Sequence, residues 1–125
     1  MIKLSNKEAL ALLSPTAQKL FADSSKPFPT KESFMILDLI QLIEQRIKLF
    51  HKQVNEVVEK YEGKVSAARI PVFKKETNRI AAEEEIQKLK EVQLEYPCEK
   101  FKLTDDWPKL SVEEAYILKP LIYTE

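Results

Sequence analysis

The chain has 125 residues, of which 44% are hydrophobic and 32% are charged, and its 20 basic and 20 acidic residues cancel at pH 7. This size fits a single domain, and zero net charge gives no overall field to attract nucleic acid or anionic lipid. No segment approaches the ~18 uninterrupted apolar residues of a membrane span, and the first residues do not resemble a signal peptide. A single cysteine, Cys98, excludes an intrachain disulfide. We therefore expect a soluble, cytoplasmic protein.

Residues 1–29 predict an extended start, a short N-terminal helix and a loop. The motif Ser5-Asn6-Lys7-Glu8 has the S-x-x-E form of a capping box, in which serine and glutamate side chains satisfy each other's backbone N–H groups. Ser14 and Pro15 can cap and open a second helical turn. Residues 23–29, with two serines and two prolines, are predicted to form a loop.

Residues 30–62 contain no glycine or proline and predict one long helix of roughly 50 Å. Thr30 is its expected N-terminal cap. Gly63, the only glycine, is its expected C-terminal cap, because glycine accepts positive φ without a Cβ penalty. Apolar residues recur at alternating steps of four and three, which predicts a heptad seam that packs against another helix. The seam comprises Ile36, Ile40, Ile43, Ile47, Phe50, Val54, Val57 and Tyr61.

A second helix is expected after a short connection over residues 64–69. Pro71 would occupy its first turn, and Phe73, Thr77 and Ile80 would begin its apolar stripe. After Ile80 the pattern shifts in phase to Ala82, Ile86 and Leu89. Because the connection is short, we expect the two helices over residues 30–95 to fold back as an antiparallel hairpin.

Residues 96–125 predict a small extended segment followed by a short helix. Val92, Leu94 and Tyr96 alternate with polar residues, as do Phe101 and Leu103, which is a strand-like rhythm that Pro97 confines to an edge or to short pieces. A second capping box at residues 111–114 opens a helix that Pro120 ends.

The predicted fold is therefore mainly α, in one domain over residues 1–125. Its centre is a long, coiled-coil-like antiparallel helical hairpin, flanked by the short N-terminal helix and the C-terminal β-like segment with its short helix. Two points stay open: whether the strand-like pieces pair with residues 2–4, and whether the heptad seam faces its own second helix or another subunit.

No residue pattern predicts catalysis, a cofactor or a metal. His51 has Ile47 and Asn55 at the i±4 positions where a helical metal site would need a second ligand. Cys98 has no histidine or other cysteine nearby in sequence. Paired carboxylates such as Glu113 and Glu114 belong to caps and turns. We therefore expect a protein that is not an enzyme.

Two features point instead to protein–protein contact. One is the heptad seam, and the other is a set of C-terminal aromatics, Phe101, Trp107 and Tyr116, which are candidate anchors for a partner. The alternative reading of these aromatics is that they pin the C-terminal segment onto the helical hairpin. Lys74, Lys75 and Arg79 are interrupted by glutamates, which favours a solvated helix face over a nucleic-acid surface.

The order of these pieces resembles a family of short, uncharacterised proteins encoded in tailed-phage and prophage genomes. The resemblance rests on three stretches: residues 2–8, the Phe28-Pro29 entrance to a long helix that ends in residues 59–63, and the ending over residues 99–122. Residues 80–94 depart from the family pattern by being longer. The resemblance implies no activity or functional residues. The genes of this family often lie among the late phage genes for tail and lysis proteins, so the resemblance implies a role in the virion or its assembly.

The leading hypothesis is thus a non-catalytic phage protein of the host cytoplasm or virion that self-associates through the heptad seam or binds another phage structural protein. The second is an inhibitor of a host defence or nucleic-acid-processing protein. Direct nucleic-acid binding is the less favoured third reading.

Overall fold

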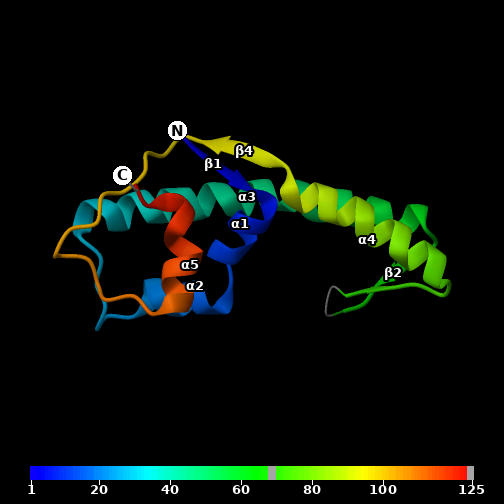
Figure 1. The fold of residues 1–125 in the computed structure, drawn as a ribbon, viewed down its shortest axis with the longest axis horizontal. Helices are drawn as coiled ribbons and strands as arrows, with labels where there is room; N and C mark the ends of the chain where they lie inside the picture. Colours follow the sequence, from blue (N-terminus) through cyan, green and yellow to red (C-terminus); the bar gives the residue numbers. More distant parts are fainter. Residues whose placement is uncertain (68–69, 124–125) are drawn as a thin grey trace.

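The computed structural model describes residues 1–67 and 70–123, and over these ranges the protein is mainly α. The long helix α3 runs along most of the elongated molecule, with α1, α2 and α5 gathered beside one part of it and α4 beside the other (Figure 1). The elements in chain order are β1 (Ile2–Ser5), α1 (Asn6–Leu12), α2 (Pro15–Ala22), α3 (Thr30–Lys60), β2 (Lys64–Val65), β3 (Pro71–Val72), α4 (Glu76–Glu91), β4 (Gln93–Tyr96), α5 (Val112–Leu118) and the 3-10 helix η1 (Lys119–Leu121).

Both predicted capping boxes are confirmed. At the start of α1, Ser5 Oγ accepts a hydrogen bond from the Glu8 N–H at 3.0 Å, and Glu8 Oε1 accepts from the Ser5 N–H at 2.9 Å. Ser111 and Glu114 form the same reciprocal pair at the start of α5. Ser14 caps α2 with Pro15 in its first turn, as expected. These caps satisfy N–H groups that a helix cannot pair internally.

The first and fourth strands form a two-stranded antiparallel sheet, which decides one point that the sequence left open. Ile2 lies opposite Tyr96, and Leu4 lies opposite Leu94. The side chains of Ile2, Leu4 and Tyr96 are buried, so the sheet turns one face toward the core. Phe101 forms only an isolated parallel bridge with Ile122, and Leu103 is exposed, so the second predicted strand piece is reduced to a single bridge.

The prediction that Thr30 caps α3 was wrong. Thr30 is already helical, and Pro29, with extended backbone (φ −54°, ψ 145°), occupies the capping position without a side-chain bond. The Ser33 hydroxyl lies 3.2 Å from the Phe28 carbonyl oxygen and 3.1 Å from that of Pro29, to which it can donate. The rigid proline therefore sets the extended turn that leads into the helix.

The prediction of positive φ at Gly63 was also wrong, because Glu62 takes the left-handed conformation (φ 59°) instead. The Glu62 N–H donates to the Glu59 carbonyl and the Gly63 N–H donates to the Val58 carbonyl, which is the Schellman pattern. Glycine is needed at position 63 for space. A Cβ there would lie 2.5 Å from Phe73 Cε1 and 2.9 Å from Val58 Cγ1.

The connection between the long helices differs from the predicted loop. Strands β2 and β3 pair in antiparallel register, with Val65 opposite Pro71, and the predicted helix start at Pro71 is wrong because α4 begins only at Glu76. Proline is tolerated here because each strand of a two-stranded ribbon is an edge strand. We call residues 63–75 the arm; of these, 68 and 69 lie outside the described residues.

Helix α4 packs against α3 through a different stripe from the one expected. Thr77 and Ile80 are exposed, whereas Ala82 is buried and Ile86 is half-buried. The later phase of the apolar pattern therefore marks the packed face. Near the end of α3, Lys60 Nζ and Tyr61 Oη lie 2.9 Å and 2.8 Å from Glu85 Oε1 of α4.

Candidate functional site

Half of the predicted heptad seam lies in the protein's own core. Four seam residues are buried and four are half-buried, while Leu39 and Val58, which lie outside the seam, are also buried. A straight helix drifts by ~20° per heptad relative to a strict 3.5-residue repeat, so its buried face widens beyond the seam. The buried four are Ile36, Ile43, Ile47 and Phe50, and the half-buried four are Ile40, Val54, Val57 and Tyr61.

The buried part of the seam packs within this chain. The residues share one hydrophobic cluster with β1, α1 and the C-terminal segment, and α3 contacts both α1 and α4. Ile43 is completely buried. Other parts of the same chain therefore cover these side chains. Only the edges of the seam are accessible to a partner.

The three C-terminal aromatics separate into two groups. Phe101 and Trp107 are buried, and Trp107 continues a chain of ring contacts with Phe28 at 5.1 Å and Phe101 at 5.7 Å between centroids. The ring contact of Trp107 with Phe28 joins the C-terminal segment to the loop between α2 and α3, whereas the alternative reading placed these aromatics on the helical hairpin. Tyr116 is 72% exposed on α5 and stays a candidate anchor. The Trp107 indole N–H is buried without a hydrogen-bond partner among the described residues.

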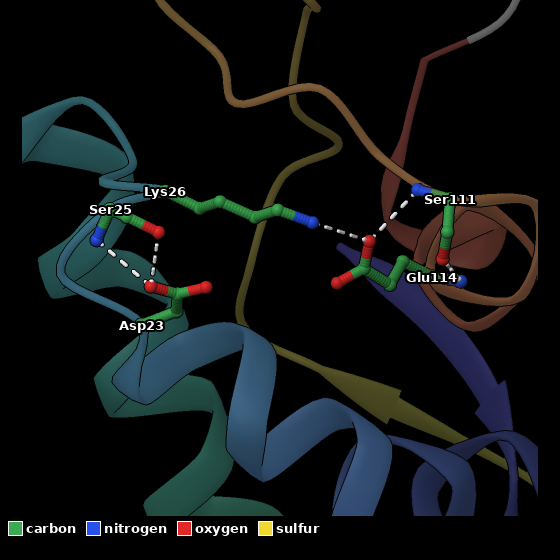
Figure 2. Close-up of polar contacts among 5 residues, drawn as sticks. All are labelled: Asp23, Ser25, Lys26, Ser111 and Glu114. Carbon is green, nitrogen blue, oxygen red and sulfur yellow. Dashed lines mark hydrogen bonds and ion pairs between the residues drawn. The ribbon is translucent and has the colours of Figure 1, made fainter.

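A polar cluster ties the loop between α2 and α3 to the start of α5 (Figure 2). Lys26 Nζ lies 3.2 Å from Glu114 Oε1, and the same oxygen accepts the Ser111 N–H at 2.8 Å. The Ser111 N–H bond, aided by the Lys26 ammonium, lowers the pKa of Glu114 from its usual range. On the loop side, Asp23 Oδ1 accepts from the backbone and hydroxyl of Ser25. The cluster holds the loop that carries Phe28 in place.

A groove of about 380 Å³ lies between α2 and the first part of α3, beside this anchored loop. Its lining is mainly aliphatic and aromatic, and Glu44 is the one charged residue among the residues that line it. Ile40 joins the groove to the predicted seam, whereas Leu37, which is 50% exposed, was not expected to matter. The lining residues are Leu12, Leu13, Gln18, Phe21, Ala22, Phe28, Ser33, Ile36, Leu37, Ile40 and Glu44.

The arm also carries accessible apolar side chains. Val65, Ile70 and Val72 are all exposed on it, although β-branched aliphatic side chains usually pack against a neighbour. The sequence of residues 63–75 holds four basic residues and no acidic one, so the arm is positively charged within a neutral chain. The signal that could have indicated this arm was the run without aspartate or glutamate.

The remaining candidates for chemistry occupy ordinary positions. Burial raises the pKa of the half-buried Cys98 thiol, which disfavours the nucleophilic thiolate. His51 lies beside Phe50 and lines a cavity with Val65 and Pro71 of the arm. Arg79 forms ion pairs with Glu76 and Glu83 on its own helix. In the described part of the chain, no three His, Cys, Asp or Glu side chains gather where a metal ion could be held.

Another cavity, of about 520 Å³, lies between α1 and the C-terminal segment and is of mixed character. Lys7, Lys100 and Lys119 line it together with Glu8 and Tyr116.

Comparison with known proteins found no matching family model, no matching curated protein and no matching solved structure. Over residues 1–67 and 70–123, none of the helices combines the length and apolar character that crossing a membrane requires.

Proposed function

We propose that this chain is a non-catalytic protein of phage or prophage origin that acts through contact with other protein surfaces, as a virion, tail or assembly component that self-associates. The origin rests on the resemblance of its sequence pieces to the phage family. The observation that supports the contact role is the accessible apolar groove beside α3, because an apolar depression with few polar groups is a surface that the side chains of a partner can fill.

The association surface that we propose is the groove edge of α3, where the predicted seam stays partly accessible. Ile40 belongs both to the seam and to the groove lining, and Leu37 extends the accessible apolar surface by one turn. The finer fold in this proposal is a coiled-coil-like antiparallel hairpin of α3 and α4. The joint approach of Lys60 and Tyr61 to Glu85 supports it.

The first test is the mass of the purified protein in solution, measured by sedimentation equilibrium over a range of concentrations. A dimer or larger assembly is expected. A monomer at all concentrations would overturn self-association.

An affinity pull-down of the tagged protein from induced or infected host cells, analysed by mass spectrometry, tests the biological setting. Recovery of tail or other virion proteins is the expected result. Recovery of a single host enzyme would overturn the structural role in favour of an inhibitor. Tight binding to duplex nucleic acid that weakens steeply with salt would instead favour a nucleic-acid-binding protein.

A further inference from the structure

The arm and the groove are complementary in two properties. The arm exposes Val65, Ile70 and Val72, and the groove is an apolar depression of a size that several such side chains can fill. The described residues of the arm include three lysines (Lys64, Lys74 and Lys75) and no acidic residue, and the charged side chain that lines the groove is the carboxylate of Glu44. We propose that the arm of one copy of this chain docks into the groove of a second copy, and that the contact is reciprocal. This proposal rests on the self-association proposed above.

Both surfaces border the same side of α3. Glu44 lines the groove, while His51 and Asn55 line a cavity together with Val65 and Pro71 of the arm. These three helical positions are separated by seven and four residues, a spacing that places them along one face of a helix. Figure 1 agrees, because α2 and β2 lie on the same side of α3, near its opposite ends.

The positions along α3 suit a two-fold arrangement. Ile40 at the groove and Tyr61 at the base of the arm are separated by roughly 30 Å of helix. A two-fold axis across the helix midway between them, near Phe50 and His51, would set two α3 helices antiparallel. Each arm would then lie over the partner's groove, so that one contact formed twice closes the dimer.

The charges around the arm favour a protein groove over nucleic acid as its partner. The base of the arm is flanked in the sequence by Glu59 in the last turn of α3, by Glu62 just after that helix and by Glu76, the first residue of α4. A phosphate backbone wide enough to engage several lysines would approach these carboxylates as well. A narrow apolar groove with one acidic residue accepts the ribbon alone.

The proposal can be tested by cross-linking in solution. In a Cys98→Ser background, Leu37→Cys protein is mixed with Val72→Cys protein and oxidised, and mixed disulfide dimers are measured by mass. Both positions are exposed, at 50% and 58%, so the fold should be kept. We expect the 37–72 pair to form at least tenfold faster than a control pair with Leu49→Cys, which is 60% exposed but does not line the groove.

Charge reversal gives an independent measurement. Glu44→Lys should weaken association by roughly tenfold, whereas Asp38→Lys, an exposed acidic residue of the same helix outside the groove, should leave it unchanged. Val72→Asp should also prevent dimer formation while the circular dichroism spectrum is retained.

The outcomes separate the two proposals. A wild-type dimer without selective 37–72 cross-linking, or one insensitive to Glu44→Lys, would overturn the arm-in-groove contact and leave self-association standing. A monomeric wild type that captures a virion protein would overturn the arm-in-groove contact and self-association, while the contact role would remain. A monomer that captures no virion protein would overturn both proposals.

Discussion

At the scale of single residues, the junction between α3 and the arm concentrates the backbone strain. Glu62 has φ 59°, a conformation in which a residue with a Cβ costs ~1–2 kcal/mol relative to right-handed helix. Glycine stands one position later, where the ring of Phe73 leaves no room for a side chain. Position 62 requires positive φ and position 63 requires the absence of a Cβ, but glycine occupies only position 63.

Replacing Glu62 by glycine should therefore stabilise the protein. The relieved strain exceeds the extra freedom that glycine brings to the unfolded chain, so the free energy of unfolding should rise by about 0.5–1 kcal/mol. Urea denaturation followed by circular dichroism measures the change. Glu59→Gly, inside the last helical turn, is the matched control and should lower the free energy of unfolding by about 1 kcal/mol.

The Lys26–Glu114 contact predicts a pH dependence of stability. The pKa of Glu114 is lowered in the folded protein, first by the Ser111 N–H. Its stabilising contribution is therefore fully present above the pKa of an unfolded glutamate, about 4.3, and is lost as pH falls through the lowered value. Glu114→Gln should destabilise the protein at pH 7, with the difference from wild type shrinking below pH about 4.

Thermal melts of the wild type and Glu114→Gln from pH 3 to pH 7 check this expectation. Glu84→Gln, an exposed residue of α4, serves as the control and should differ little from wild type at any pH. A constant difference between Glu114→Gln and wild type across the range would contradict the assigned role of the charge.

At the scale of elements, one buried amide connects the two parts of the molecule. Asn6, at the start of α1, donates from Nδ2 to the Leu89 carbonyl at 2.8 Å, and its backbone N–H donates to the Val92 carbonyl at 3.1 Å. Asn6 is among the few buried polar side chains of the described chain. It thus holds the end of α4 and the start of β4 against the N-terminal helix.

Asn6→Ala should cost about 0.5–1.5 kcal/mol, because the side-chain hydrogen bond to the Leu89 carbonyl is lost while that carbonyl keeps the bond from the Val92 N–H. Hydrogen exchange should show the loss first in α4 and β4. Lys3→Ala is the contrasting change. Its 4.0 Å contact with Glu95 is exposed, and such pairs contribute ~0–1 kcal/mol. Equal losses in the two variants would contradict the role of Asn6.

At the scale of the whole molecule, the burial of the seam means that a mutation in it affects folding stability before it affects association. Ile43→Asp would place a carboxylate at a fully buried position in the cluster that joins β1, α1 and α3. We expect a loss of about 4 kcal/mol or more and extensive unfolding, rather than clean dissociation of an oligomer. Circular dichroism and sedimentation of the same sample distinguish the two.

Leu49→Asp is the control for this experiment. Leu49 belongs to the same helix but is exposed, so the variant should keep both its fold and its association state. An Ile43→Asp protein that is folded but forms a smaller assembly would contradict the expectation. It would indicate that the seam forms the subunit interface.

The sequence alone determined the local features of this protein. The capping boxes at Ser5 and Ser111 and the continuous helix from residue 30 depend on groups three or four positions apart, so their signals lie within a short window. The strand-like rhythm of residues 92–96 was also readable, because alternation is a property of neighbouring residues.

Only the tertiary structure decided which chain segments meet. The pairing of β1 with β4 joins residues about ninety positions apart, and the groove combines side chains from α1, α2, the loop and α3. Periodicity identified an apolar face on α3, but the partners on each side of that face set which residues are buried and which stay accessible. The need for glycine at position 63 likewise comes from the close approach of Phe73 and Val58 and not from the backbone conformation of position 63 itself.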